Sequence, residues 1–310
     1  MLSGFLITGI LLRCRDARGS FLRGDARKFQ LRQFYVRRIL RIVPLFYAVV
    51  LAAAIINIRP ARETLLWHLG YASNVLMALQ NGWSGPLSHF WTLAVEEQFY
   101  LVWPCLILFL PRKFILPTMI GAIAIAPIYR IVSPSLGINP IAIEVLLFGA
   151  LDFLGIGALL AFFQHTNAHR WSETARSKTY ICAGVVTSLA LLASAFLAPR
   201  FEWLGMVAAP LFFAWLIHKA AHGFDGPLGR GMQWKPLLYL GQISYGLYIF
   251  HKLLTTVVPH GFQILHLPYP SNVWVQVVLL MIINVLLASV SWFVLERPIN
   301  RLKRHFNYAR

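Results

Sequence analysis

Two adjacent carboxylates, Glu96 and Glu97, stand inside an apolar run that extends over residues 90–110. A charged side chain near the centre of a bilayer costs about 2.5–3.5 kcal/mol on insertion scales, so the pair is expected to face a bundle interior or a wet cavity. Consecutive residues point about 100° apart around a helix, so the two carboxylates cannot face the same way. They could act as a general base for a hydroxyl, as an orienting partner for a histidine or as a proton relay. The structural alternative is an ion pair with a neighbouring helix.

A second group of polar and small residues lies near the other end of the chain. Gly241, Ser244, Tyr248 and His251 recur at steps of three, four and three, which places them on one face of a single helix. Such a stripe either lines a site or forms the close-packing face of a bundle helix. We expect His251 near the same outer end of the membrane as the glutamates, in a catalytic or a structural role.

Three arginines lie at the start of the first long apolar run. Arg37 and Arg41 share a helix face at a spacing of four residues, and Arg38 lies three residues before Arg41. Three guanidinium groups in this position could hold phosphate groups through paired hydrogen bonds. Alternatively they anchor the helix to lipid phosphates on the positive side of the membrane.

The remaining polar residues carry weaker signals. Asp152 falls in the middle of an apolar run, where a carboxylate is costly unless it is paired. Two histidine pairs, His165/His169 and His218/His222, have a spacing that could bind a metal, but we expect them at cytoplasmic helix ends without the acid or cysteine that would complete a ligand set. We therefore predict no metal site, and the sequence contains no motif of a soluble enzyme.

The elements that must position these residues are membrane helices. Of the 310 residues, 58% are hydrophobic and only 13% are charged, which is typical of an integral membrane protein. Residues 62–79 suit an amphipathic helix at the interface. We expect an all-α bundle of about nine crossings, formed by residues 2–12, 39–58, 90–110, 114–132, 141–163, 180–197, 203–217, 236–258 and 273–295.

The basic residues give this bundle an orientation. If the first loop is cytoplasmic, 23 of the 28 Lys and Arg residues fall in cytoplasmic segments. The net charge of +17 then reflects the loops on one membrane face and not a nucleic-acid site. The N-terminus of this chain is expected outside and the C-terminus in the cytoplasm.

Four segments, in this order, carry a resemblance to a known family. They are residues 2–8 (LSGFLIT), 37–47 (RRILRIVPLFY), 91–104 (WTLAVEEQFYLVWP) and 241–251 (GQISYGLYIFH). Together they resemble the acyltransferase 3 family of integral-membrane O-acyltransferases. The resemblance implies an enzyme of the cytoplasmic membrane that moves an acyl group, commonly acetyl, from cytoplasmic acetyl-CoA to a hydroxyl of a cell-surface glycan, lipid-linked sugar, peptidoglycan or similar acceptor. Acyl-CoA would be a co-substrate, with no permanently bound cofactor.

The chain departs from the family at its start. Members usually have about ten membrane helices, and the first carries an arginine followed eleven positions later by a histidine needed for transfer. This sequence has no counterpart of either residue, and Met1 falls where the family has its second helix. We expect a single membrane domain over residues 1–310 that lacks the family's first helix.

The resemblance also implies roles for particular residues. Glu97, with Glu96 as the second choice, would orient the missing histidine or the acceptor, and His251 would take part in catalysis. The residues implied in donor binding are Arg37, Arg38 and Arg41, and those implied in lining the pocket are Tyr100, Ser244, Tyr245 and Tyr248.

Two other functions remain compatible with the sequence. In a proton-coupled transporter or flippase, buried acids and a histidine would couple protons to substrate movement, and helices would be broken in paired halves. The other alternative is an inactive, truncated relative with a regulatory role.

Overall fold

The computed structural model describes residues 1–16, 24–196, 202–224 and 226–308, and its described elements are all helices. The first half contains α1 (Leu2–Asp16), α2 (Gly24–Ile55), α3 (Leu65–Leu69), α4 (Ser73–Gln80), η1 (Gly85–Leu87), α5 (Phe90–Phe109), α6 (Arg112–Val132) and η2 (Ser133–Leu136). The second half contains α7 (Pro140–Val145), α8 (Leu147–Thr166), α9 (Ala168–Arg176), α10 (Lys178–Phe196), α11 (Glu202–His222), α12 (Gly226–Met232), α13 (Lys235–Gln242), α14 (Ser244–Ile264), α15 (Val273–Ser291), the π-helical turn η3 (Trp292–Glu296), α16 (Arg297–Arg301) and η4 (Leu302–His305).

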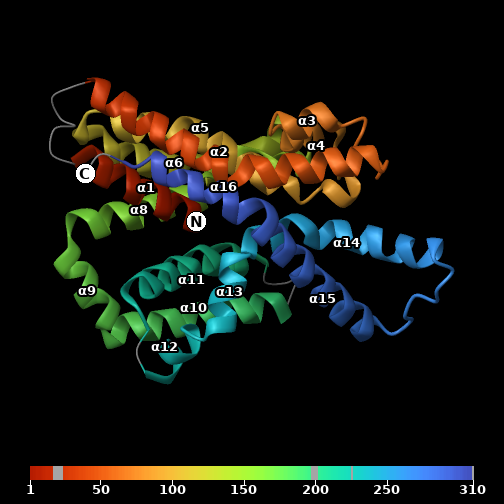
Figure 1. Ribbon diagram of the computed structural model, residues 1–310. Coiled ribbons are helices and arrows are strands. Elements are labelled where there is room, and N and C mark those ends of the chain that lie inside the picture. The colour runs from red at the N-terminus through yellow and green to blue at the C-terminus, as the bar shows by residue number, and fades with distance from the viewer. Residues whose placement is uncertain (17–23, 197–201, 225, 309–310) are drawn as a thin grey trace.

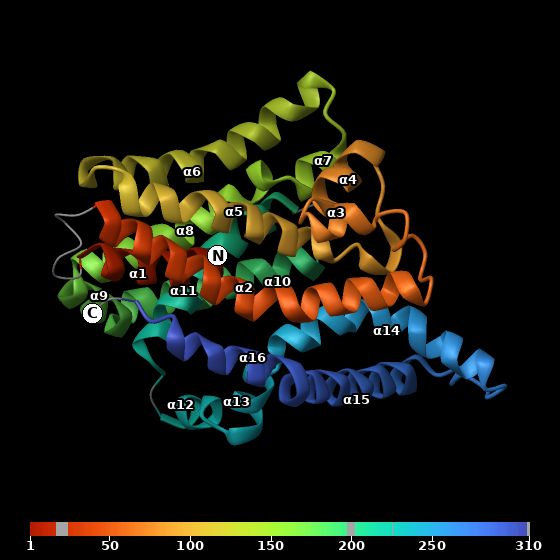
Figure 2. The same ribbon diagram turned by 45° about the horizontal axis from the view of Figure 1, so that its top comes forward.

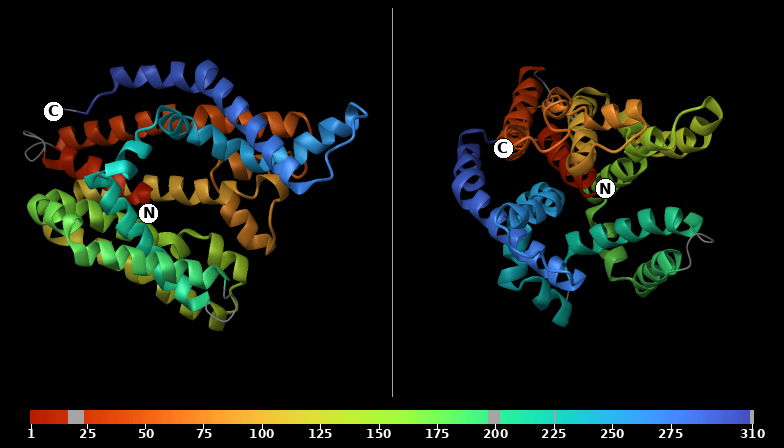
Figure 3. Two further views of the ribbon diagram at one scale, coloured as in Figure 1. Left: turned by 90° about the horizontal axis from the view of Figure 1, so that it is seen from below. Right: turned by 90° about the vertical axis from the view of Figure 1, so that its right-hand side faces the viewer.

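The helices of the first half form one bundle together with α8. Helix α8 packs against both α1 and α6, and α1 also packs against α5 (Figures 1 and 2). Helices α10 and α11 pair with each other, as do α14 and α15, whereas the C-terminal elements run beside α2 (Figure 3). The four segments that carry the family resemblance therefore lie beside one another, because α5 contacts α1 and α2, and α2 in turn contacts α14.

Large apolar side chains fill the centre of this bundle. Phe34 and Phe46 of α2 and Phe90 and Phe99 of α5 are among the largest fully buried side chains. Phe99 stacks on Trp103, whose indole Nε1 donates a 2.8 Å hydrogen bond to the Thr8 hydroxyl. This buried bond fixes α1 against α5.

Close contact with α8 fixes the other side of α1. A Cβ atom added at Gly4 would lie 2.1 Å from the backbone oxygen of Leu154, and one added at Gly157 would lie 2.0 Å from the backbone oxygen of Met1. At Gly9, in contrast, the nearest atom would be 3.7 Å away, at Nη1 of Arg13. Small residues thus let the two helices approach, as in other membrane bundles.

We expect the Gly4→Ala substitution to destabilise the protein by about 2 kcal/mol or more, because neither backbone can yield to the added methyl group. Thermal unfolding of the detergent-solubilised protein measures this effect. The matched control is Gly9→Ala, which has room for its methyl group and gains up to about 1 kcal/mol in helix propensity. Equal unfolding temperatures for the two variants would contradict the packing of α1 on α8.

Several predicted segments are confirmed as helices, but the predicted number of crossings is not confirmed. Among the described residues, five helices are long and apolar enough to cross a membrane, and a sixth is found if a bent pair of helices at residues 168–174 and 179–194 counts as one span. The five are Gly24–Ile55, Phe90–Phe109, Arg112–Leu136, Pro140–Thr166 and Val273–His305.

Two predicted helices are broken in the structure. The run 141–163 is interrupted at Leu146, whose ψ of 151° is extended, and the run 236–258 is interrupted at Ile243. The expectation that residues Gly241 to His251 form one continuous helix was therefore wrong. The interfacial segment 62–79 forms two short helices, α3 and α4, and not one.

Candidate active site

A cavity of about 340 Å³ lies where α1, α2, α5 and α14 meet, and we call it the central cavity. Seven of the ten site residues predicted from the sequence line it: Arg38, Arg41, Glu96, Tyr100, Ser244, Tyr245 and Tyr248. The others lining it are Leu2, Ser3, Leu6, Ile42, Thr92 and Leu93. The structure thus brings together side chains that are up to about 250 residues apart in the sequence.

Glu96 is the carboxylate of the central cavity. Its Oε1 accepts a 2.8 Å hydrogen bond from the Ser3 hydroxyl, and its Oε2 accepts a 3.0 Å bond from the Tyr100 hydroxyl. Each oxygen keeps a further lone pair that is free to accept a proton or a hydrogen bond. The carboxylate is therefore held in place and still able to receive a substrate hydroxyl.

Glu97 does not line the central cavity. Its side chain is half-buried, and its Oε1 has no hydrogen-bond partner among the described residues. The two carboxylates diverge, as the sequence predicted, but the one that faces the cavity is the second choice, Glu96. Tertiary packing set the rotation of α5 and so decided between them.

Two arginines bring positive charge to the central cavity. Arg38 lies with its guanidinium carbon 5.0 Å from the ring centre of Tyr100, and Arg41 lines the cavity from the next turn of α2. Neither forms an ion pair with a carboxylate among the described residues. Arg38 interacts electrostatically with Glu97, and Arg41 with Glu296, but without direct ion pairs, so both guanidinium groups keep N–H donors for an anionic ligand.

Arg37, the third predicted clamp residue, points elsewhere. Its Nη1 donates hydrogen bonds to the backbone oxygens of Lys303 and Phe306, at 3.0 and 3.1 Å. Its guanidinium carbon also lies 5.3 Å from the ring centre of Tyr308. Arg37 therefore holds the C-terminal segment against α2 and does not contact the central cavity.

The tyrosines of α14 form the opposite wall. The Tyr245 hydroxyl donates a 2.7 Å bond to the backbone oxygen of Ile42, and that of Tyr248 donates a 2.5 Å bond to the backbone oxygen of His89. The Ser244 hydroxyl has no hydrogen bond among the described residues. Ser244 is thus the free hydroxyl donor of this wall.

His251 lies outside the central cavity. It is exposed, its Nδ1 lies 2.6 Å from the backbone oxygen of Tyr248, and its ring centre is 4.8 Å from that of His89. His89 itself is 9% exposed, and burial lowers its pKa to about 4, with a smaller effect from the neighbouring His251. The histidine pair supports the end of α5 behind the cavity wall.

The sequence analysis missed Ser3 and Thr92, which line the central cavity. Thr92 Oγ1 lies 2.6 Å from the Tyr248 hydroxyl and so connects α5 to α14. A signal for Thr92 was available, because Thr92, Glu96 and Tyr100 recur every four residues and define one polar face of α5. Ser3 gave no such signal, since its role depends on how α1 meets α5.

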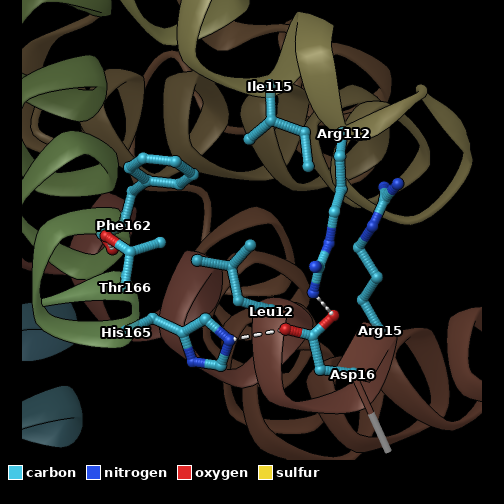
Figure 4. Close-up of a pocket in the computed structure, with 8 residues that line it drawn as sticks. All are labelled: Leu12, Arg15, Asp16, Arg112, Ile115, Phe162, His165 and Thr166. Atoms are coloured by element: carbon cyan, nitrogen blue, oxygen red, sulfur yellow. Dashed lines mark hydrogen bonds and ion pairs between the residues drawn. The ribbon is translucent and has the colours of Figure 1, made fainter.

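A second pocket, of about 320 Å³, lies where the ends of α1, α6 and α8 meet (Figure 4). There the Asp16 carboxylate lies between Arg112, at 2.5 Å, and His165, at 2.8 Å. This acid already has two partners, and none of the ten predicted site residues lines the pocket. The ion pairs therefore hold three helix ends together.

Neither histidine pair lies in a metal-binding cluster. His165 pairs with Asp16, while His218 is hydrogen-bonded through Nδ1 to the Tyr180 hydroxyl at 2.6 Å. In the part of the chain that the structure describes, no group of three or more His, Cys, Asp or Glu residues could hold a metal ion.

Comparison with known proteins assigns the chain to a family. A family model described as an acyltransferase domain matches residues 1–293. The chain is 27% identical over 330 residues to a peptidoglycan O-acetyltransferase, OatA, of Listeria monocytogenes, covering 97% of this chain and 50% of the relative. It is 25% identical over 329 residues to an O-acetyltransferase, OatA, of Staphylococcus aureus, covering 97% of this chain and 51% of the relative.

The chain spans about half the length of these curated relatives. No solved structure matches it. The family model nevertheless covers nearly the whole chain, including every residue of the central cavity. The chain therefore belongs to the acyltransferase 3 family, a family of membrane acyltransferases.

Proposed function

We propose that the protein is an O-acetyltransferase of the cell membrane that moves an acetyl group from cytoplasmic acyl-CoA to a hydroxyl of peptidoglycan or a related cell-surface carbohydrate. The relatives named as O-acetyltransferases support the reaction class and the glycan acceptor. The observation that carries the proposal is the central cavity, which joins a held carboxylate to two guanidinium groups that form no direct ion pair among the described residues.

The reaction is the attack of a hydroxyl on a thioester. As the acceptor oxygen bonds to the thioester carbonyl carbon, Glu96 takes the hydroxyl proton as general base. Negative charge then develops on the carbonyl oxygen, and the hydroxyl of Ser244, which lines the cavity, would donate to it. When the tetrahedral intermediate collapses, the carbon–sulfur bond breaks, and the CoA thiolate leaves and takes up the proton.

Arg38 and Arg41 would bind the donor through its anionic groups. Two guanidinium groups near one ligand give charge-assisted hydrogen bonds, which are about twice as strong as neutral ones. Donor and acceptor must share one cavity for direct transfer, because orientation of the two reactants supplies a large part of the rate. We propose that the cavity receives the donor from the cytoplasmic side and the acceptor from the outer side.

Transfer of radiolabelled acetyl from acetyl-CoA to added glycan strands, in vesicles that contain the protein, tests the proposal. We expect the Arg38→Gln/Arg41→Gln variant to raise the KM for acetyl-CoA by about tenfold or more, because charged hydrogen bonds contribute about 1.5–3 kcal/mol each. The matched control is Arg32→Gln, an exposed residue of the same helix outside the cavity.

The absence of labelled glycan at any acetyl-CoA concentration would refute the transferase. Proton-coupled movement of a substrate without acyl-CoA would instead support a transporter. An effect of Arg32→Gln equal to that of the double variant would show that general positive charge, and not the cavity, attracts the donor.

A further inference from the structure

A further cavity, of about 460 Å³, adjoins the central cavity and is distinct from the pocket of Figure 4; we call it the side cavity. The two cavities share the side chains of Arg41 and Tyr245. The other residues of the side cavity are Leu238, Gly241, Gln242, Trp292, Glu296 and Asn300. The reaction described above uses none of these six.

The π-helical turn Trp292–Glu296 forms the polar wall of the side cavity. Trp292, Glu296 and Asn300 follow one another at steps of four residues, and all three line the cavity. Short π-helical turns inside α-helical segments are frequent at functional sites. The opposite wall comes from the end of α13, next to the break at Ile243.

The carboxylate of Glu296 is a buried hydrogen-bond acceptor in the side cavity that can accept further hydrogen bonds from a ligand. The residue is only 5% exposed, and its Oε1 accepts a 2.9 Å hydrogen bond from the Ser291 hydroxyl. No further hydrogen bond to this carboxylate occurs among the described residues. A buried carboxylate is costly unless N–H or O–H groups bond to it, so a ligand that presents such groups fits the site.

The neighbouring side chains offer both donors and acceptors. Gln242 makes no hydrogen bond with the described residues, and Asn300 accepts one at Oδ1 from the Lys303 ammonium group, which leaves its Nδ2 free. Carboxamides pair with amide groups in both directions. The indole of Trp292 and the side chain of Leu238 add apolar surface beside them.

This wall matches a chain of secondary amides better than it matches a phosphate. An amide N–H donates to a carboxylate, whereas a phosphate is repelled by one. Acyl-CoA carries such a chain, the pantetheine arm, between its thioester and its phosphates. We propose that the side cavity binds the pantetheine arm of the donor, with Gln242, Glu296 and Asn300 as its amide partners.

This inference depends on the proposed function only for the identity of the donor. It places the thioester in the central cavity and directs the arm past Arg41 and Tyr245, the two side chains that the cavities share. Gln242 and Asn300 then bind the pantetheine arm of the donor, and this binding does not depend on the nucleotide part of CoA.

Calorimetric binding to the purified full chain tests the inference with three ligands: CoA, pantetheine and 3′-phosphoadenosine 5′-diphosphate. We expect Gln242→Ala and Asn300→Ala each to weaken binding of CoA and of pantetheine by the same factor, roughly 2- to 10-fold, which is the effect of losing one neutral hydrogen bond. Binding of the nucleotide fragment should not change. The matched control is Gln263→Ala, an exposed glutamine at the far end of α14.

Two results would contradict the inference. Weakened binding of the nucleotide fragment would place the nucleotide in the side cavity, and unchanged binding of all three ligands would separate this cavity from the donor altogether. Acetyl transfer measured in parallel distinguishes the two proposals. If the protein transfers acetyl but Gln242→Ala and Asn300→Ala leave pantetheine binding unchanged, the inference is wrong and the transferase proposal stands. If the two substitutions weaken pantetheine binding but the protein transfers no acetyl, the transferase proposal is wrong and the inference stands.

Discussion

Replacing Glu96 by Gln is expected to lower the rate of acyl transfer by about 10²–10⁴-fold, the usual contribution of a positioned general base. The amide keeps the size of the side chain. Its oxygen can accept from one of the two hydroxyls that bond to the carboxylate, those of Ser3 and Tyr100 at 2.8 and 3.0 Å, and its NH2 group can donate to the oxygen of the other. It cannot take the proton of the acceptor. The loss should therefore appear in kcat with acetyl-CoA as the donor, while the KM for the donor changes little.

The adjacent residue provides the matched control. Glu97→Gln changes a carboxylate on the same turn of α5 that does not line the central cavity. It should leave kcat within about tenfold of the unsubstituted protein, at equal protein level in the membrane. If Glu97→Gln abolished transfer and Glu96→Gln did not, the assignment of the general base would be wrong.

The sequence was sufficient to predict which segments line the central cavity. Membrane helices must bury their polar groups, so an acidic pair in α5, an arginine group in α2 and a polar stripe in α14 had to converge or be paired elsewhere. The structure places members of all three groups at one cavity, whereas Glu97, Arg37 and His251 do not line it. Asp152 was likewise expected to need a partner, and Arg130 supplies it.

The rotation of individual side chains was harder to predict. The i±4 neighbours of Glu97 are Leu93 and Leu101, whereas Glu96 lies between Thr92 and Tyr100 on a polar face, so the local pattern favours Glu96. The expectation drawn from the family resemblance put Glu97 first, although the matching segment contains both acids. Attention to the four-residue period would have predicted that Glu96 lines the central cavity.

Other details depend on contacts that no local pattern encodes. Arg37 and Arg38 are neighbours in one basic segment, but only Arg37 donates hydrogen bonds to the C-terminal segment, at the backbone oxygens of Lys303 and Phe306. The break at Ile243 separates Gly241 from the tyrosines of α14, although the sequence is compatible with one helix. Both features arise where segments far apart in the chain pack together.

The ion pair between Arg130 of α6 and Asp152 of α8 is expected to make a large contribution to stability. Its N···O distance is 2.5 Å, the side chains are 34% and 12% exposed, and Arg130 also donates a 2.7 Å bond to the backbone oxygen of Gly149. Asp152→Asn leaves the guanidinium without a counter-charge, which costs about 3–5 kcal/mol in a buried site. We expect about 3 kcal/mol, because a third of Arg130 remains exposed.

A double-mutant cycle in detergent measures this coupling. Arg130→Met combined with Asp152→Asn should recover much of the loss, since it removes both charges and leaves neither one buried alone. The pair Arg112–Asp16 is the comparison: it has the same 2.5 Å distance, but Arg112 is 62% exposed. Arg112→Met should therefore cost no more than about 1 kcal/mol. If the effects of Arg130→Met and Asp152→Asn on the free energy of unfolding were additive, the two side chains would not be coupled. If the losses of stability at Arg130–Asp152 and Arg112–Asp16 were equal, burial would not determine the strength of the ion pair.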